Sequence, residues 1–225
     1  MSIPNNKTKG DYLHKVVEVG LNSLPFGSIL AAIFDEAIQP PLEKRRQEWF
    51  KSIDQRLRRL EEDDIDISGL INNNLFIDML LEASAIAIKS SEQEKLLALQ
   101  NAVINTALNE SIADTSKRIF VQKIDQFTVW HLKLLQLMSD PRLELKRQGK
   151  KPNSYIAGSI SQVVFQAFPF FEGNKELLDI IWNDLYSSGF VTTSSVASSG
   201  SSSGMYNSRT TEFGEKFLHF VKDHN

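Results

Sequence analysis

Two segments near the end of the chain decide the predicted fold: residues 175–190, KELLDIIWNDLYSSGF, and residues 207–221, NSRTTEFGEKFLHFV. In the first, apolar side chains recur at helical spacing on one side: Leu177, Leu178, Ile181, Leu185 and Tyr186. Gly189 follows, and glycine commonly ends a helix because it adopts positive φ. In the second, Thr211 and Glu212 open a helix whose predicted buried side chains are Phe213, Phe217, Leu218 and Phe220.

Between these two helices the sequence predicts a pair of short strands. Residues 190–193, FVTT, have the β-branched and aromatic composition of a strand. The serine- and glycine-rich tip that follows has no side chains able to pack, and residues 205–209 can pair back as a second strand. The expected unit is therefore helix, strand, loose tip, strand and helix.

Further helices precede this unit. Thr128 is the expected cap of the helical segment VWHLKLLQLM, residues 129–138, which should end at Asp140 and Pro141. Residues 142–153 are polar and basic, so we expect a loop there. Residues 154–168 form the next predicted helix, which Pro169 closes.

Three helices, a two-stranded wing and a closing helix, in this order over residues 128–225, resemble a winged helix-turn-helix. The resemblance implies that residues 175–188 form the recognition helix and residues 190–210 the wing. It also implies DNA binding. However, the recognition helix carries Glu176, Asp179 and Asp184 against the single Lys175, and a phosphate backbone repels carboxylates. An acidic third helix fits protein docking better.

The residues that we expect at a phosphate or a partner lie elsewhere. Five form a basic run before the second helix, and two more lie on the third helix and at the end of the wing: Arg142, Lys146, Arg147, Lys150, Lys151, Asn183 and Arg209. Such a run can contact phosphates without distinguishing sequence. Asn183 has the one amide on the third helix suited to a base edge.

The earlier part of the chain predicts helix after helix, so we expect a helical bundle over residues 1–127 and the winged-helix-like domain over residues 128–225, sharing a core. The bundle's predicted helices cover residues 12–24, 28–38, 42–62 and 74–89, then one from Glu92 and one from Asp114 or Thr115. Whether residues 74–108 form one kinked helix or two stays open. Apolar spacing over residues 42–60 is compatible with a homodimer or with a face inside the bundle.

The segment LNSLPFGSILAAIFDEAIQPPLEKRRQEW, residues 21–49, is similar to uncharacterised bacterial proteins, and this resemblance implies no activity. Residues 20–34 carry no charged side chain and are broken by Pro25, Phe26 and Gly27. The run is shorter than the roughly 20 residues of a spanning helix, so a buried hairpin is the first interpretation. A membrane-inserting hairpin of a bacterial toxin or defence effector is the alternative.

Composition excludes several classes of protein. The 225 residues are 41% hydrophobic and 24% charged, which is typical of a globular chain, and the net charge of −3 gives no general attraction to nucleic acid. Cysteine is absent, which excludes disulfides and thiolate chemistry. The first residues lack the pattern of a secretory signal, so we expect a cytoplasmic protein.

No catalytic motif emerges, and we expect neither an enzyme, nor a cofactor, nor a metal. Asp64, Asp66, Ser68 and Gly69 match the start of a calcium-binding loop, but Leu75 stands where the bidentate glutamate is needed, which favours an ordinary acidic turn. His131 is an expected packing residue. A pocket beside His131 or Trp130 is the place where a ligand site would lie if the chain were an enzyme or ligand-binding protein. The leading hypothesis is a non-enzymatic regulatory or docking protein that binds protein first and DNA second.

Overall fold

The computed structural model describes residues 39–63, 65, 67–108, 111–153, 157–201 and 204–223. The chain divides into two compact units, residues 1–45 and 46–225. Of the first unit, only residues 39–45 are described, as the opening turns of helix α3. The predicted helices over residues 12–24 and 28–38 and the apolar hairpin lie outside the described residues. Among the residues that the structure describes, no helix is both long enough and apolar enough to cross a membrane.

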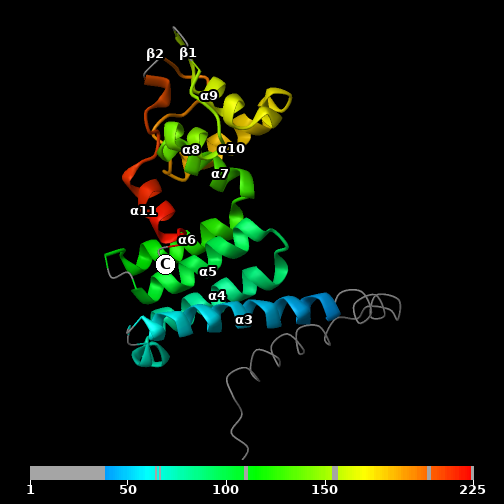
Figure 1. The fold of residues 1–225 in the computed structure, drawn as a ribbon, viewed down its shortest axis with the longest axis vertical. Coiled ribbons are helices and arrows are strands. Elements are labelled where there is room, and N and C mark those ends of the chain that lie inside the picture. The colour runs from blue at the N-terminus through cyan, green and yellow to red at the C-terminus, as the bar shows by residue number, and fades with distance from the viewer. Residues whose placement is uncertain are drawn as a thin grey trace, which may run out of the picture. The chain divides into compact units, whose positions relative to one another are not determined.

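The protein is mainly α-helical, with a two-stranded antiparallel sheet near the C-terminus, as predicted (Figure 1). The α-helices are α3 (Gln39–Glu62), α4 (Asn74–Lys89), α5 (Gln93–Leu108), α6 (Asp114–Gln126), α7 (Val129–Ser139), α8 (Pro141–Arg147), α9 (Ile160–Ala167), α10 (Lys175–Ser187) and α11 (Glu212–Phe220). Short 3₁₀ helices are η2 (Ser68–Asn72), η3 (Pro169–Glu172) and η4 (Gly204–Tyr206), and the strands are β1 (Ala157–Ser159) and β2 (Ser199–Ser201).

Helices α4, α5 and α6 pack on one another, and α11 packs against α5, α6 and α7 (Figure 1). Residues 46–62 of α3 are joined to this bundle by polar contacts. The indole of Trp49 donates a hydrogen bond of 2.8 Å to the buried hydroxyl of Ser84 on α4. Arg56 donates to the side-chain oxygen of Asn101 on α5 at 2.5 Å. The break between α4 and α5 at Ser90 shows two helices rather than one kinked helix.

One apolar cluster runs from Trp49 to Phe220, so it contains side chains from both sides of the predicted boundary at residue 127. At its centre, Phe120 of α6 lies 5.4 Å from Phe217 of α11 and 6.4 Å from Phe190, between ring centroids. Rings at these distances and tilted angles attract one another beyond their buried area. The division into residues 1–127 and 128–225 stays a prediction.

Local capping explains most of the helix boundaries in the last hundred residues. Thr128 caps α7 in a capping box with His131, and Thr211 accepts a hydrogen bond from Gly214 at the start of α11. Gly189 has a φ of 78°, as predicted for the residue that ends α10. The capping residues therefore fix where these helices begin and end.

Several predictions about this part of the chain are wrong. The basic segment predicted as a loop begins as helix α8, because the Asp140 carboxylate accepts from the Leu143 amide and Pro141 occupies the first turn. The helix predicted from residue 154 begins at Ile160, capped by Ser159. Residues just before it form β1, which pairs with β2 in the register Ala157–Ser201 to Ser159–Ser199.

The predicted hairpin of residues 190–193 and 205–209 is therefore replaced by a different pairing. Only a bridge between Val191 and Thr210 joins those two segments, and Met205 lies in η4. On α10, Leu178, Ile181 and Leu185 are buried as predicted, whereas Leu177 and Tyr186 are 39% and 43% exposed. Trp182 is 1% exposed and belongs to the core.

Candidate functional site

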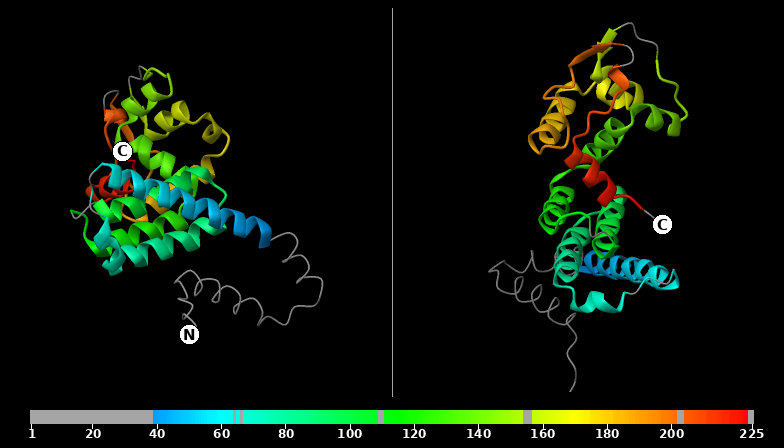
Figure 2. Two further views of the ribbon diagram at one scale, coloured as in Figure 1. Left: turned by 60° about the horizontal axis from the view of Figure 1, so that its bottom comes forward. Right: turned by 90° about the vertical axis from the view of Figure 1, so that its left-hand side faces the viewer.

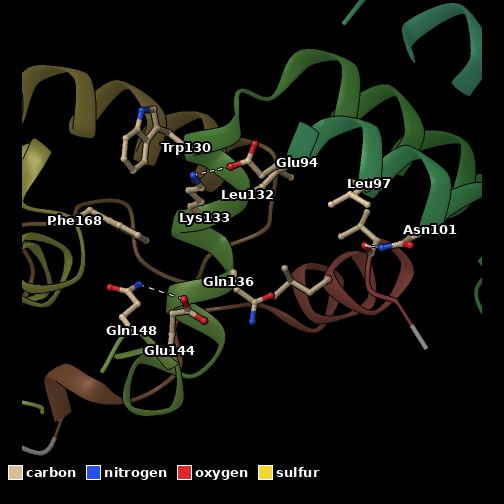
Figure 3. Close-up of a pocket in the computed structure, with 13 residues that line it drawn as sticks. Glu94, Leu97, Asn101, Trp130, Leu132, Lys133, Gln136, Glu144, Gln148 and Phe168 are labelled. Carbon is tan, nitrogen blue, oxygen red and sulfur yellow. Dashed lines mark hydrogen bonds and ion pairs between the residues drawn. The ribbon is translucent and has the colours of Figure 1, made fainter. Parts of the chain in front are cut away.

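An apolar groove of about 450 Å³ lies between helices α5, α7, α8 and α11 (Figure 3). On the α5 side, Glu94, Leu97, Ala98 and Asn101 line it at the i, i+3, i+4, i+7 spacing of one helix face. Leu97 is 50% exposed, which is high for a leucine. The volume is within the range of ligand-binding clefts in proteins.

The opposite wall comes from α7 and the two segments that pack beside it. Trp130 and Leu132 of α7, Phe168 at the end of α9, and Leu218 and Val221 at the end of α11 supply the apolar surface. The lining is mainly carbon, so water there has few hydrogen-bonding partners on the wall. Burial of an apolar side chain in such a groove is favourable in proportion to the area removed from water.

Charged side chains stand at both ends of the groove. The Lys133 ammonium lies 2.9 Å from the Glu94 carboxylate, and this hydrogen bond lowers the pKa of Glu94 (Figure 3). At the other end, the Glu144 carboxylate accepts from Gln148 at 3.2 Å and lies 3.6 Å from Arg147. The groove lining itself therefore carries two carboxylates and one ammonium.

Trp130 is the aromatic centre of this wall. Its ring stacks on Phe170 at 5.2 Å with an interplanar angle of 3°, and Phe168 and Phe171 approach it edge-on. The Lys133 nitrogen lies 5.5 Å from the Trp130 centroid. The indole is thus held in place by three phenylalanines and a cation, which makes it a preformed contact surface.

His131, next to Trp130, lies on the buried side of α7 and is 4% exposed. Its ring stacks on Phe127 at 4.7 Å. The backbone N–H of Thr128 donates to Nδ1 at 3.1 Å, so the neutral ring carries its proton on Nε2, which lies 3.4 Å from the Asp184 carboxylate of α10. Burial lowers the pKa of His131, and the hydrogen bond with Asp184 opposes that shift.

The seven residues expected at a phosphate or a partner do not meet at one place. Arg142, Lys146 and Arg147 are exposed on α8, and the Arg142 guanidinium lies 4.9 Å from the Tyr206 ring centroid. Lys150 donates to the carbonyl of Ala167 at 2.7 Å, which fixes the end of α9. Lys151 is exposed beyond α8.

The remaining two belong to other segments of the chain. Arg209 bonds the carbonyl of Gly204 at 2.7 Å and that of Ser208 at 3.3 Å, so its guanidinium is turned back onto its own loop. Asn183 is exposed on α10 beside the carboxylates of Glu176, Asp179 and Asp184. The cationic side chains and the third helix thus present surfaces of opposite charge.

The sequence pointed to Trp130 but missed the rest of the groove. Its lining residues come from stretches as far apart as Glu94 and Val221, and no local motif connects them. The one available signal was the row formed by Glu94, Leu97, Ala98 and Asn101 on a single helix face, which by itself only predicts an amphipathic helix. Within the described ranges no group of histidine and carboxylate side chains is arranged to hold a metal ion.

Comparisons of the chain with protein-family models, with curated proteins and with solved structures gave no match.

Proposed function

We propose that residues 128–225 form a winged-helix-like docking module, and that the groove beside Trp130 takes an apolar, basic helical segment of a partner protein. The succession of α7, α9 and α10, with α8 and β1 between the first two, followed by the Val191–Thr210 bridge and α11, supports the winged-helix part. Most of the groove lining comes from this region, with α5 supplying the remaining wall.

The observation that carries the docking function is the combination of apolar walls with carboxylates at both ends. Leu97 and Trp130 offer apolar contact area, while the carboxylates of Glu94, paired with Lys133, and of Glu144, paired with Arg147, stand at the two ends. An amphipathic helix that enters a groove inserts side chains at i, i+3, i+4 and i+7, and the α5 face has the matching spacing. Basic residues flanking that stripe would be attracted by the two carboxylates.

Protein rather than DNA is the partner that the charges favour. The exposed surface of α10, the helix that would enter a groove of DNA, carries Glu176, Asp179 and Asp184. These three carboxylates would repel a phosphate backbone, and the single ammonium of α10, on Lys175, does not balance them. Arg209, the cation expected at the end of the wing, is bonded to backbone carbonyls.

A photo-crosslinking experiment tests the groove. A benzophenone amino acid at Leu97 should crosslink one defined protein in the cells that make this chain, whereas the same group at exposed Asn207 should not. The captured protein should then bind the purified wild-type chain, and Leu97→Arg should weaken that binding at least tenfold. Leu81→Arg is the matched control, because Leu81 is similarly exposed, at 44%, but lies on α4 outside the groove. Equal loss in both variants would refute the proposal.

Fluorescence anisotropy of a labelled random-sequence duplex, at low and at physiological salt, tests the competing DNA function. We expect no binding that depends on the basic residues. Salt-sensitive binding that disappears when Lys146, Arg147, Lys150 and Lys151 are all changed to alanine would instead place phosphates on that surface.

A further inference from the structure

Helices α8 and α10 each expose a face with an aliphatic centre and charges of a single predominant sign. On α8, Leu143 is 43% exposed, and the exposed cations near it in sequence are Arg142, Lys146 and Arg147, against the carboxylates of Asp140 and Glu144. On α10, Ile180 is 54% exposed and is surrounded by Glu176, Asp179 and Asn183. We call these the basic face and the acidic face. Each has one exposed aliphatic side chain, and their predominant charges are opposite in sign.

Helical geometry puts each set on one side of its helix. Arg142 and Lys146 are four residues apart, as are Leu143 and Arg147, so the four side chains form two adjacent rows. Glu176, Ile180 and Asn183 likewise follow one another at spacings of four and three, with Asp179 beside them. The buried residues of α10, Leu178, Ile181, Trp182 and Leu185, lie on the opposite side, so the acidic face is turned away from the core.

The two faces are turned away from each other within one chain. Helix α8 packs on α7 and α9, whereas α10 packs on α7 and η3. The right-hand view of Figure 2 shows α8, in lime, and α10, in gold, on opposite sides of this part of the chain. The charges of one face therefore cannot be neutralised by the other face of the same molecule.

We propose that the acidic face of α10 binds the basic face of α8 on a second copy of this chain, which links copies head to tail. Charge complementarity selects this occupant, because Glu176 and Asp179 would meet Arg142, Lys146 and Arg147 around a contact between Ile180 and Leu143. The whole chain has a net charge of −3, so this attraction comes from the separation of charge between the two faces. When two copies bind in this way, one acidic face and one basic face remain unoccupied. Further copies can bind to these faces, so the assembly grows into a ring or an open chain of copies.

Two faces of this size make a small interface, so the contact is expected to be weak and sensitive to salt. Exposed charges interact over about 10 Å at 0.1 M ionic strength and over about 3 Å at 1 M. Sedimentation velocity of the wild-type full-length chain should therefore show mass increasing with protein concentration at low salt, and this association should weaken at least tenfold in 0.5 M NaCl.

Two variants, each defective in one face, give the decisive test. Glu176→Gln, Asp179→Asn and Ile180→Ser together disable the acidic face, and Leu143→Ser, Lys146→Gln and Arg147→Gln together disable the basic face. Each triple variant alone should stay monomeric. Their mixture should form a complex of one copy of each and grow no further, because only one intact acidic face and one intact basic face remain.

Circular dichroism and thermal unfolding of both triple variants verify that they are folded. If the acidic-face variant does not fold, Glu176→Gln with Asp179→Asn replaces it. If the basic-face variant does not fold, Lys146→Gln with Arg147→Gln replaces it. A monomeric wild-type chain at low salt would overturn the proposal. So would a wild-type dimer that does not grow, or a mixture of variants that stays monomeric. None of the residues changed in these variants lines the groove beside Trp130, so this result can be distinguished from that of the docking function proposed above.

Discussion

The side-chain amide of Asn105 on α5 donates a hydrogen bond of 2.8 Å to the backbone carbonyl of Phe220, the last residue of α11. The same amide donates to the carbonyl of Lys222 at 2.9 Å, and Asn101, one turn earlier, donates to that of Val221 at 2.7 Å. The last carbonyls of a helix have no partner within the helix. Two asparagines of α5 thus satisfy the C-terminal end of α11 and hold it against the bundle.

Replacement of Asn105 by alanine should destabilise the protein by about 1–3 kcal/mol, because it leaves buried carbonyls without a donor. Urea unfolding measures this loss, and hydrogen exchange should show faster exchange of the α11 amides than in the wild-type chain. Asn207→Ala is the control, since Asn207 is exposed, and it should change the free energy of unfolding by less than about 0.5 kcal/mol. Unchanged stability of Asn105→Ala would show that water replaces the amide.

Gly214 lies where α11 crosses the backbone of Phe190. A Cβ atom at this position would lie 2.4 Å from the Phe190 carbonyl oxygen, which itself accepts from the Thr211 amide at 3.0 Å. Gly214→Ala should therefore destabilise the fold by about 1–3 kcal/mol, even though alanine favours helices over glycine by about 1 kcal/mol.

Gly173→Ala is the matched control for this prediction. Gly173 has a φ of −91° and open space around its Cβ position, so alanine there should be neutral or slightly stabilising. Thermal unfolding of both variants separates the two effects. Equal melting temperatures for Gly214→Ala and Gly173→Ala would contradict the close approach of α11 to Phe190.

The accuracy of the sequence prediction depended on how local the determining contacts are. Thr128 and Thr211 cap helices through residues three positions away, so their patterns could be recognised. Strand β1 could not be recognised from the sequence, because Ala157 and Gly158 have no local preference for a strand. The strand forms by pairing with β2, which lies about forty residues later. The capping box of Ser159 with Gln162 was a local signal that could have placed the start of α9 correctly.

Other errors came from signals with two meanings. Asp140 followed by Pro141 ends one helix, but a carboxylate before proline is also a strong start, and both events occur there. On α10, Leu177 and Tyr186 have the helical spacing of the buried side but are 39% and 43% exposed. Trp182 completes the core instead, and its indole donates to the carbonyl of Thr193 at 2.9 Å, in a loop after the helix.

Trp130 should dominate the response of the protein to a fluorescence quencher. Trp49 and Trp182 are 3% and 1% exposed, whereas Trp130 lines the groove and is only partly buried. Acrylamide should quench one component of the emission of the wild-type chain, and Trp130→Phe should lose that component. Trp182→Phe is the control and should keep it. Quenching that persists in Trp130→Phe would mean that the groove does not hold the indole as described.

Stability should decrease below neutral pH because of His131. Burial lowers the pKa of its imidazole in the folded state, and the ammoniums of Lys95 and Lys123 act in the same direction, while Asp184 opposes them. The unfolded chain, with a histidine pKa of about 6.5, then binds more protons than the folded chain at mildly acidic pH. The free energy of unfolding should therefore be fully retained above that pKa, at about pH 7.5, and be lower below it, at about pH 5.5.

His131→Gln isolates this contribution, since glutamine at the third helical position can still complete the capping box with Thr128 but does not titrate. Urea unfolding at the two pH values should show a smaller loss of stability for the variant than for the wild-type chain. Identical pH dependence of His131→Gln and the wild-type chain would show that protonation of His131 is tolerated in the folded state, with Asp184 and the hydroxyl of Thr128 stabilising the charged ring in place.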